Sequence, residues 1–454
     1  HILMERIFMA SNVILIFGDQ WRAQAFGYAG NTCVQTPHID RFASQSINAT
    51  HAVSGCSVCC PARASLLTGQ YPLTHGVFVN DVHLSDRAVS LAQAFKSAGY
   101  DTAYVGKWHV NANGRSNYIP PENRQGFDYW KVLECTHNYN NSFYYANDSD
   151  EKLTWEGYDA IAQTRDVQEY IENHDSDNPF LLVLSWGPPH APYETAPEKY
   201  RAMYRPEDVP LRENVPPESE ENAREWIAGY YAHCTALDDC MGDLLQTLDD
   251  KGIADDTLLL FFSDHGDMLG SQGSAKKQQP WEESIRIPFL LRWPAQFGLE
   301  GREIPDPIDI PDIMPTLLGL CGIDVPDTVE GLDFSAYLRG GENPSDGAAL
   351  LQCPQPFGQW TRDRGAREYR GLRTGQYTYV RSLNGPWLLY DNEADPFQLS
   401  NLVDDPEYAD LRRELDAYLQ RRLDVRGDEF LPGADYIRQW GYTVNESGTV
   451  PYKN

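Results

Sequence analysis

The segment from Gly55 to Gly69 has the clearest pattern for chemistry, because three cysteines lie just before a run of helix-forming residues. Pro61 suits the first turn of a helix, where its missing N–H has no partner to lose, and Gly69 can end the helix. Cys59 is therefore predicted to lie at a helix N-terminus, where free N–H groups and the helix dipole favour an anion, with Arg63 one turn further on. The alternative is that these cysteines are small buried hydrophobic residues, which most cysteines are.

The cysteine pattern as a whole does not favour a disulfide scaffold. The chain has nine cysteines in 454 residues, an odd number at low density. Cys56, Cys59 and Cys60 lie close enough together to consider zinc. No second CxxC pair or HxxxH follows at zinc spacing, so zinc is the weaker alternative for this cluster.

Three continuous apolar runs indicate strands that are buried on both faces of a sheet. They cover residues 12–17, 180–185 and 257–262, and helix-like stretches at 163–172 and 225–250 precede the second and third runs. Alternating helices and buried strands predict an α/β domain with a large, mostly parallel sheet between layers of helices.

Side chains suited to acid–base or metal chemistry follow each of these runs. Asp19 follows the first run, two prolines and His190 follow the second, and Asp264 and His265 follow the third. Ligands of open α/β sheets bind beyond the carboxyl ends of the strands, so we expect these side chains to meet at one edge. The prolines fix the loop that carries His190, which places this residue well as a general acid, and a loop histidine without a role is the alternative.

A smaller second domain is predicted after the large one. The composition changes at 339–348, a stretch rich in Gly, Asn, Pro and Ser that is typical of a linker. Period-2 runs at 369–373, 376–380 and 387–390 predict an antiparallel sheet, and a helix with one apolar face is predicted from 408 to 423. We therefore expect an N-terminal α/β domain of residues 1–345, which carries the chemistry, and a C-terminal α+β domain of residues 346–454.

The charge balance excludes several classes of partner. Lys and Arg total 37 against 66 Asp and Glu, which gives a net charge of −29. A general nucleic-acid binder needs clustered basic residues, and an anionic membrane surface would repel this chain. No run of 18 apolar residues occurs, so no membrane insertion is predicted. An anionic substrate would require a local positive site within an acidic protein.

The start of the sequence allows two expectations for location. His1 before Met4 looks like the remnant of an expression tag. If Met4 is the natural start, the chain lacks a signal peptide and a cytoplasmic location is expected. If the tag replaced a signal peptide, a periplasmic or secreted protein is expected.

The string Cys59-x-Pro61-x-Arg63, continued by the residues 64–69, resembles the signature of the type I sulfatases of the alkaline phosphatase superfamily. Ala62 departs from the usual serine, and some relatives also carry alanine there. Segments at 36–40, 312–318 and 389–402 extend the resemblance over nearly the whole chain. The resemblance implies that Cys59 is oxidised to formylglycine by a formylglycine-generating or sulfatase-maturating enzyme.

A formylglycine explains how one residue can both form and break a sulfate ester. Its hydrate is a geminal diol, and one hydroxyl attacks sulfur and expels the alcohol, which leaves a covalent sulfo-enzyme. Deprotonation of the other hydroxyl re-forms the aldehyde and expels sulfate by breaking its C–O bond. A serine ester would instead need a second attack by water.

The resemblance also implies one divalent cation, with Ca²⁺ expected and Mg²⁺ or Mn²⁺ as alternatives. Gln20 stands where a second aspartate is usual, and its neutral oxygen suits a hard cation. His265 stands where an asparagine is usual, and it either binds the metal or hydrogen-bonds a sulfate oxygen. The implied ligands are Asp19, Gln20, Cys59 as formylglycine, Asp264 and His265.

Two further motifs supply the implied contacts to sulfate. The string GKWH at 106–109 resembles a second sulfatase motif, and Lys107 and His109 lie two apart on a predicted strand, so they should face the same side. The resemblance implies that this pair holds the diol and the sulfate, and that His109 is the base that opens the sulfated intermediate. Lys277 resembles a lysine that contacts sulfate and the leaving oxygen, with Lys276 as the alternative register.

The substrate is predicted from a polar, aromatic stretch at 134–145 that contains His137. Sugars are bound by such mixtures, and a surface loop packed by its own tyrosines is the alternative. We expect this loop and the C-terminal domain to shape a pocket for a sulfated saccharide, with His137 among the binding residues. The acidic surface favours short oligosaccharides or chain ends over long polymers.

The function predicted from the sequence is therefore a formylglycine-dependent carbohydrate sulfatase, a sulfuric ester hydrolase that degrades sulfated polysaccharides or oligosaccharides. A phosphonate monoester or phosphodiester hydrolase of the same superfamily is the alternative, because it shares the string DQWR at 19–22, although it usually lacks GKWH. The non-enzyme alternative is an inactive binder of sulfated glycans, which would apply if Cys59 stays unconverted.

Overall fold

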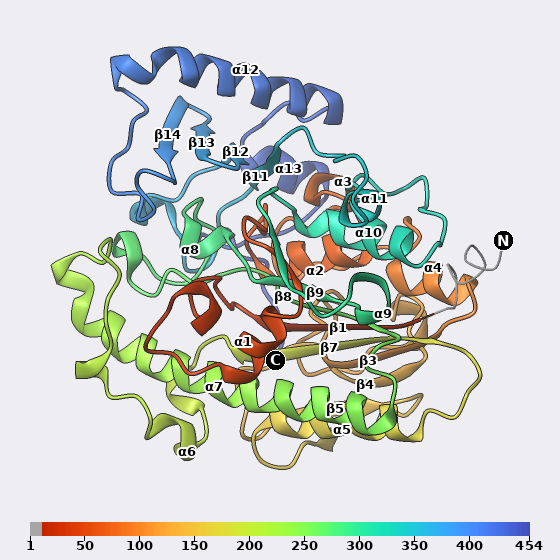
Figure 1. The fold of residues 1–454 in the computed structure, drawn as a ribbon. Coiled ribbons are helices and arrows are strands. Elements are labelled where there is room, and N and C mark those ends of the chain that lie inside the picture. Colours follow the sequence, from red (N-terminus) through yellow and green to blue (C-terminus); the bar gives the residue numbers. More distant parts are fainter. Residues whose placement is uncertain (1–10) are drawn as a thin grey trace.

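The computed structural model describes residues 11–454, which form a large and a small sheet with helices around them (Figure 1). The predicted start at Met4 lies outside the described residues. Within those residues, no helix combines the length and the hydropathy needed to cross a membrane.

The large sheet has ten strands in the order β10-β2-β9-β8-β1-β7-β3-β4-β5-β6. The central neighbours β8, β1, β7, β3 and β4 run parallel, whereas β9 and β5 pair antiparallel with their neighbours. This arrangement confirms the predicted large, mostly parallel sheet. The strands are β1 Asn12–Asp19, β2 Ile47–Ala49, β3 Asp101–Lys107, β4 Tyr129–Leu133, β5 Phe143–Ala146, β6 Leu153–Thr154, β7 Phe180–Pro189, β8 Thr257–Ser263, β9 Phe289–Arg292 and β10 Arg302–Ile304.

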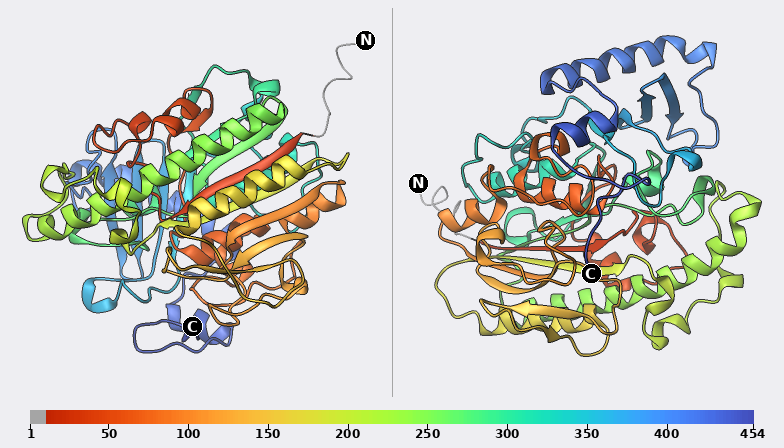
Figure 2. Two further views of the ribbon diagram at one scale, coloured as in Figure 1. Left: turned by 90° about the horizontal axis from the view of Figure 1, so that it is seen from below. Right: turned by 180° about the vertical axis from the view of Figure 1, so that it is seen from behind.

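Both faces of the sheet are covered, which explains why its central strands are apolar without interruption. Along β1, Val13 and Leu15 enter the hydrophobic core on one face, and Ile14 and Ile16 enter the core on the other. The first core contains side chains of α2, α4 and α10, and the second contains those of α1, α5 and α7. Figure 2 shows α5 and α7 side by side against the sheet.

The helices of this larger body vary from one turn to 32 residues. They are α1 Pro37–Ala43, α2 Cys59–Thr68, α3 Pro72–His75, α4 Leu91–Ser97, α5 Asp159–Asn173, α6 Glu198–Arg201, α7 Glu220–Lys251, α8 Glu282–Ile285, α9 Pro294–Phe297, α10 Ile313–Leu320 and α11 Ser335–Leu338.

The small sheet is antiparallel, as predicted, and has four strands in sequence order. They are β11 Ala348–Cys353, β12 Tyr369–Thr374, β13 Tyr377–Ser382 and β14 Gly385–Asp391. Helix α12, Ala409–Arg426, covers the outer face in the upper part of Figure 1, and Leu415 and Leu419 pack there against the strands. The other face packs on Val53 and Ile285 of the larger body.

The chain returns to the larger body after α12. Helix α13, Gly433–Gln439, places Tyr436 and Ile437 in the same core as α2 and α10, and Trp440 and Tyr442 pack against that core. The segment after α12 thus forms a second connection between the small sheet and the core of the larger body.

One local prediction is wrong. Lys107 is the last residue of β3, and His109 lies beyond the strand with a positive φ of 61°, so the two do not share a strand face. Helix α2 fits the prediction closely: it begins at Cys59, and Gly69 ends it in the left-handed region with φ 65°.

A buried ion pair fixes the small sheet on the larger body. Arg373 of β12 donates from Nε to Glu282 Oε1 of α8 at 2.7 Å and from Nη2 to Oε2 at 3.2 Å, and both side chains are buried. We expect Arg373→Ala to lower the free energy of unfolding by about 3–5 kcal/mol, because it leaves the buried carboxylate with only Arg286, at 3.5 Å, as a cationic partner. Denaturant unfolding at pH 7 measures this change.

The exposed pair of Arg413 and Asp410 supplies the control, since Arg413→Ala should change the same free energy by no more than about 1 kcal/mol. Burial acts to raise the pKa of Glu282, but Arg373 outweighs it and lowers this pKa to about 2. The pair therefore stabilises the fold above the ordinary carboxyl pKa and loses this effect as the pH falls towards 2. A gap between wild type and Arg373→Ala that stays constant over this pH range would contradict the assignment.

Candidate active site

The predicted meeting of strand ends at one edge of the sheet is found in the structure. Strand β1 ends at Asp19, β3 ends at Lys107, and β7 and β8 end just before His190 and Asp264. The N-terminus of α2 brings Cys59 to the same edge, where its Sγ lies 3.5 Å from Asp19 Oδ1. Four strand ends and one helix start thus assemble the site.

Asp19 is the central acceptor of the site. It is fully buried, and its Oδ2 accepts hydrogen bonds from Lys107 Nζ and, at 3.3 Å, from Arg63 Nη2. Its Oδ1 lies 3.5 Å from His265 Nε2. Burial acts to raise the pKa of Asp19, but Lys107, His190 and Arg63 outweigh it and hold this pKa well below the ordinary value. The carboxylate is therefore ionised in the interior.

Arg63 connects the two carboxylates that face Cys59. Its Nη2 lies 3.1 Å from Asp264 Oδ2, in addition to its contact with Asp19. Its Nη1 donates to the backbone oxygen of Lys107 and to Ser185 Oγ, both at 2.8 Å. These four contacts hold the Arg63 guanidinium in one orientation near residue 59. Its positive charge therefore does not have to move to stabilise negative charge at that residue.

Cys59 lies among positive groups. Its Sγ is 3.2 Å from His265 Nε2. Burial and Asp19 act to raise the pKa of this thiol, but Lys277, Lys107 and His265 outweigh them and place the pKa well below its ordinary value. Negative charge at position 59 is thus stabilised by the surroundings, as the predicted anion site at a helix start requires.

Four of the five implied metal ligands form a compact cluster. The ligand atoms of Asp19, Cys59, Asp264 and His265 all lie within 4.8 Å of one another and are buried. Two carboxylates and an imidazole beside residue 59 form a donor set that fits a divalent cation. Cys59 is the one member of the cysteine group 56, 59 and 60 that joins this cluster, which does not favour the zinc alternative.

Gln20 borders this cluster in a strained backbone position with φ 70°. Its backbone N–H donates to Asp264 Oδ1 at 3.0 Å, its Nε2 donates to Asp267 Oδ2, and its Oε1 accepts from Lys277 Nζ at 2.7 Å. The amide oxygen thus faces the site but is shared with Lys277, and its role as a metal ligand stays a prediction.

Lys277, His190 and His137 line the opposite side of the site. Lys277 Nζ lies 2.8 Å from His190 Nε2, and His190 Nδ1 lies 2.7 Å from the carbonyl oxygen of Ala191. The ring of His137 stacks on that of His190 with centroids 4.6 Å apart. His137 is an exposed residue, and its stacking on His190 brings the predicted sugar-binding loop to the catalytic edge. Burial and Lys277 hold the pKa of His190 well below its ordinary value. A neutral imidazole is a poor acid, so this pKa does not favour His190 alone as the predicted general acid, and that role stays a prediction.

His109 belongs to a separate pair. Its Nε2 lies 3.5 Å from Asp81 Oδ1, and Arg115 donates to the same carboxylate at 2.9 and 2.7 Å. Burial acts to lower the pKa of His109, but neighbouring Cys135, Cys60 and Asp81 raise it well above the ordinary value. A protonated imidazole donates a proton, so this pKa does not favour the predicted role of general base, which stays a prediction.

Several residues that hold the site were not identified from the sequence. Asp267 accepts from Gln20 and from Tyr193 Oη, at 2.5 Å each, and follows Asp264 by three residues, a spacing that should have drawn attention. Ser185 lies inside a predicted strand and gave no signal of its contact with Arg63. Asp81 lies in a loop without regular structure, and only the tertiary structure brings it to His109.

Comparison with known proteins gives a consistent picture. A family model described as sulfatase matches residues 11–323, and one described as N-sulphoglucosamine sulphohydrolase, C-terminal, matches residues 270–424. The chain is 44% identical to an ulvan-active sulfatase of Formosa agariphila, over 97% of this chain and 86% of that protein. It is 31% identical to an endo-4-O-sulfatase of Bacteroides thetaiotaomicron, over 86% and 87% of the two chains.

Solved structures agree in fold. A 4S-sulfatase from work on glycosaminoglycan metabolism in Bacteroides thetaiotaomicron superposes with a TM-score of 0.84 at 29% identity, covering 95% of this chain and 99% of that one. A phosphonate monoester hydrolase of Agrobacterium radiobacter superposes with a TM-score of 0.74 at 25% identity, covering 98% and 100%.

The cluster around Asp264 yields a test by metal binding. We expect Ca²⁺, Mg²⁺ or Mn²⁺ at 100 times its dissociation constant to stabilise chelator-treated protein by about 2.7 kcal/mol, because a ligand that binds only the folded state adds its binding energy. Asp264→Ala should lose most of this gain, measured as the shift of the melting temperature on titration.

A second group of ligand types, His38, Asp238 and Asp239, provides a matched control. In that group the Asp238 carboxylate accepts hydrogen bonds from the backbone N–H groups of His38 and Ile39 in the first turn of α1. These bonds explain why Asp238 lies there without the need for a metal ion. Asp239→Asn should therefore keep the full metal-dependent shift. An equal shift in wild type and Asp264→Ala would rule out the cluster as the metal site.

Proposed function

Because the chain belongs to the sulfatase family and is a sulfuric ester hydrolase, we propose that it removes sulfate from a sulfated oligosaccharide or polysaccharide. The observation that carries the choice of substrate is the 44% identity to an ulvan-active sulfatase along 97% of this chain. The similar structure of a 4S-sulfatase from work on glycosaminoglycan metabolism supports the same class. Ulvan is thus the first polysaccharide to try.

We assign the nucleophile to residue 59, after a maturation enzyme has oxidised Cys59 to formylglycine. When hydrated, this residue supplies the hydroxyl that attacks sulfur. Support comes from its place at the start of α2, from its burial, and from the cations that stabilise negative charge there. The thiol of the unmodified chain stands where the reacting oxygen would be.

We assign a divalent cation, Ca²⁺ first, to Asp19, Gln20, Asp264, His265 and residue 59. Oxygen donors dominate this set, which suits Ca²⁺ or Mg²⁺, and the imidazole of His265 also suits Mn²⁺. When bound, the cation would polarise a sulfate oxygen and favour the deprotonated nucleophile.

The fixed cations of the chain would hold the sulfate group. Arg63 and Lys107 are anchored on Asp19, and Lys277 approaches from the opposite side through Gln20 and His190. Their positions do not depend on the substrate, so the charge that develops on the sulfate oxygens meets donors that are already oriented. This arrangement stabilises the transition state in a buried, low-dielectric site.

The pair of Lys277 and His190 is assigned to protonation of the leaving oxygen. Lys277 donates its hydrogen bond to His190 Nε2, so a proton of the ammonium group lies between the two side chains. The contact between His190 Nδ1 and the Ala191 carbonyl sets the ring orientation. An alkoxide leaves a sugar with difficulty unless it receives a proton, which makes this pair necessary for sugar substrates.

A panel of substrates tests the proposal. We expect the wild-type enzyme to hydrolyse 4-nitrophenyl sulfate and sulfated oligosaccharides from ulvan faster than an aryl phosphonate monoester. In His190→Ala, kcat on the sugar sulfate should fall by about 10²–10⁴, the usual size of general acid catalysis, while kcat on 4-nitrophenyl sulfate falls much less. The reason is that nitrophenolate leaves without a proton.

The panel also separates the alternatives. Faster turnover of the phosphonate than of every sulfate would favour the phosphonate monoester hydrolase that shares this fold. Equal losses on sugar and aryl sulfates in His190→Ala would remove this histidine from the protonation step. Sulfate release from aryl esters but from none of the glycans tested would contradict the glycan assignment.

A further inference from the structure

A large cleft of about 730 Å³ lies beside the catalytic edge, between the larger body and the small sheet. Its walls come from the first turns of α7, the loop at 270–276, the start of α8, and residues 359–367 and 387 near the small sheet. Lys276 lines this cleft, whereas the next residue, Lys277, binds Gln20 and His190 in the catalytic site. One short piece of backbone therefore separates the cleft from the reacting groups.

The cleft is rich in aromatic rings that are only half-buried. Trp226, Trp281 and Trp387 line it and keep exposed surface. The rings of Trp281 and Trp387 meet edge to face with centroids 5.9 Å apart, and Trp281 Nε1 donates to Tyr390 Oη at 3.3 Å. These contacts hold the rings rigidly, so they offer flat apolar faces at low entropic cost, as carbohydrate sites require.

The charged residues that line the cleft are positive, whereas the chain as a whole is negative. Lys276, Arg364 and Arg367 line it, and no carboxylate does, in a protein of net charge −29. Among the described residues, none of these three cations forms a salt bridge. Arg367 lies over the Trp387 ring at 4.3 Å, and Lys276 Nζ lies over the Tyr193 ring at 5.4 Å. Their positive charge thus lines the cleft without an ion pair, although Asp267 and Glu194 act on Lys276, and Asp363 interacts with Arg364, at longer range.

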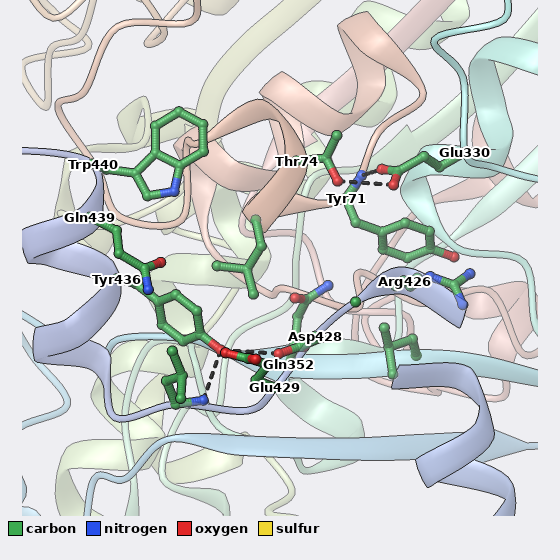
Figure 3. Close-up of a pocket in the computed structure, with 14 residues that line it drawn as sticks. Tyr71, Thr74, Glu330, Gln352, Arg426, Asp428, Glu429, Tyr436, Gln439 and Trp440 are labelled. Carbon is green, nitrogen blue, oxygen red and sulfur yellow. Dashed lines mark hydrogen bonds between the residues drawn. The ribbon is translucent and has the colours of Figure 1, made fainter. Parts of the chain in front are cut away.

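Four other cavities differ in this respect, since each is lined by Asp or Glu. The cavity of about 200 Å³ between α3 and the end of α12 is an example (Figure 3). There Glu330 accepts from the Tyr71 backbone N–H and from Thr74 Oγ1, and Asp428 accepts from Tyr436. Glu330, Asp428 and Glu429 thus place carboxylates in its lining, which makes this cavity less suited to an anion.

We propose that the cleft is a distal subsite that binds a second anionic group, sulfate or carboxylate, on a sugar next to the one that is desulfated. This inference rests on the proposed glycan substrate and deepens it: the substrate is a saccharide chain with at least two acidic positions. The tryptophans stack on the sugar rings, and Arg364, Arg367 and Lys276 pair with the acidic group. The remaining acidic surface directs such a chain to this one cleft.

Kinetics of an Arg364→Ala/Arg367→Ala variant test the subsite. With an ulvan tetrasaccharide, we expect KM to rise about tenfold or more, the size of lost charge-assisted hydrogen bonds, while kcat holds. With 4-nitrophenyl sulfate, which cannot reach the cleft, both constants should stay at wild-type values. Trp387→Ala should raise the KM for the tetrasaccharide in the same way. Arg413→Ala, on helix α12, is the matched control and should change the constants for neither substrate.

Two chemical forms of the probe distinguish the source of the anionic group. If reducing the tetrasaccharide carboxylates to alcohols abolishes the difference between wild type and double variant, the subsite binds a carboxylate. If the difference remains, it binds a second sulfate. Both results support the subsite.

An unchanged KM for the tetrasaccharide in the double variant would overturn the subsite and leave the sulfatase assignment intact. If wild type does not turn over the tetrasaccharide, calorimetric binding to Cys59→Ala protein takes the place of kinetics. Equal affinity with and without the two arginine substitutions would then overturn the subsite, whereas a loss on substitution would support it even though the glycan assignment had failed.

Discussion

The buried carboxylate of Asp19 is the constraint on which the rest of the site depends. A charge at the end of a central strand, out of contact with water, is tolerable only with partners that supply opposite charge and hydrogen bonds. Lys107 and Arg63 meet this need, and each comes from a different element. Strand β1, helix α2 and strand β3 must therefore all be correctly placed relative to one another before the Asp19 carboxylate has its partners. The same set of charges is what an anionic ester needs.

Much of this arrangement was predictable from sequence because the governing patterns are local. Continuous apolar runs identified β1, β7 and β8, and the polar residues after each run identified the catalytic edge. The cysteine followed by Pro61 identified the start of α2. These patterns work because a strand buried on both faces leaves only its end for polar chemistry.

The remainder depended on contacts between distant parts of the chain. His109 was placed on a strand by its spacing from Lys107, but the backbone leaves the strand at that point and turns the imidazole towards Asp81. The three-residue strands β2 and β10 have no periodic pattern long enough to detect. The cleft draws tryptophans from residues 226, 281 and 387, and no local rule relates positions so far apart.

The acidic composition also takes on a different meaning. A net charge of −29 disfavours the binding of long polyanions. The cations of the catalytic site offset this repulsion for a single sulfate group only. The cleft without carboxylates adds a second positive region, and Lys276 in its lining is next in sequence to the catalytic Lys277. Charge thus selects the route and orientation of the substrate as well as its class.

We infer that residue 59, as formylglycine among these charged side chains, is the group that attacks the sulfate ester. Mass spectrometry of the peptide that carries residue 59, on preparations made with and without a maturation enzyme, measures the converted fraction. We expect specific activity on 4-nitrophenyl sulfate to be proportional to this fraction and to vanish when Cys59 remains a thiol. Full activity in a preparation whose Cys59 is entirely unconverted would contradict it.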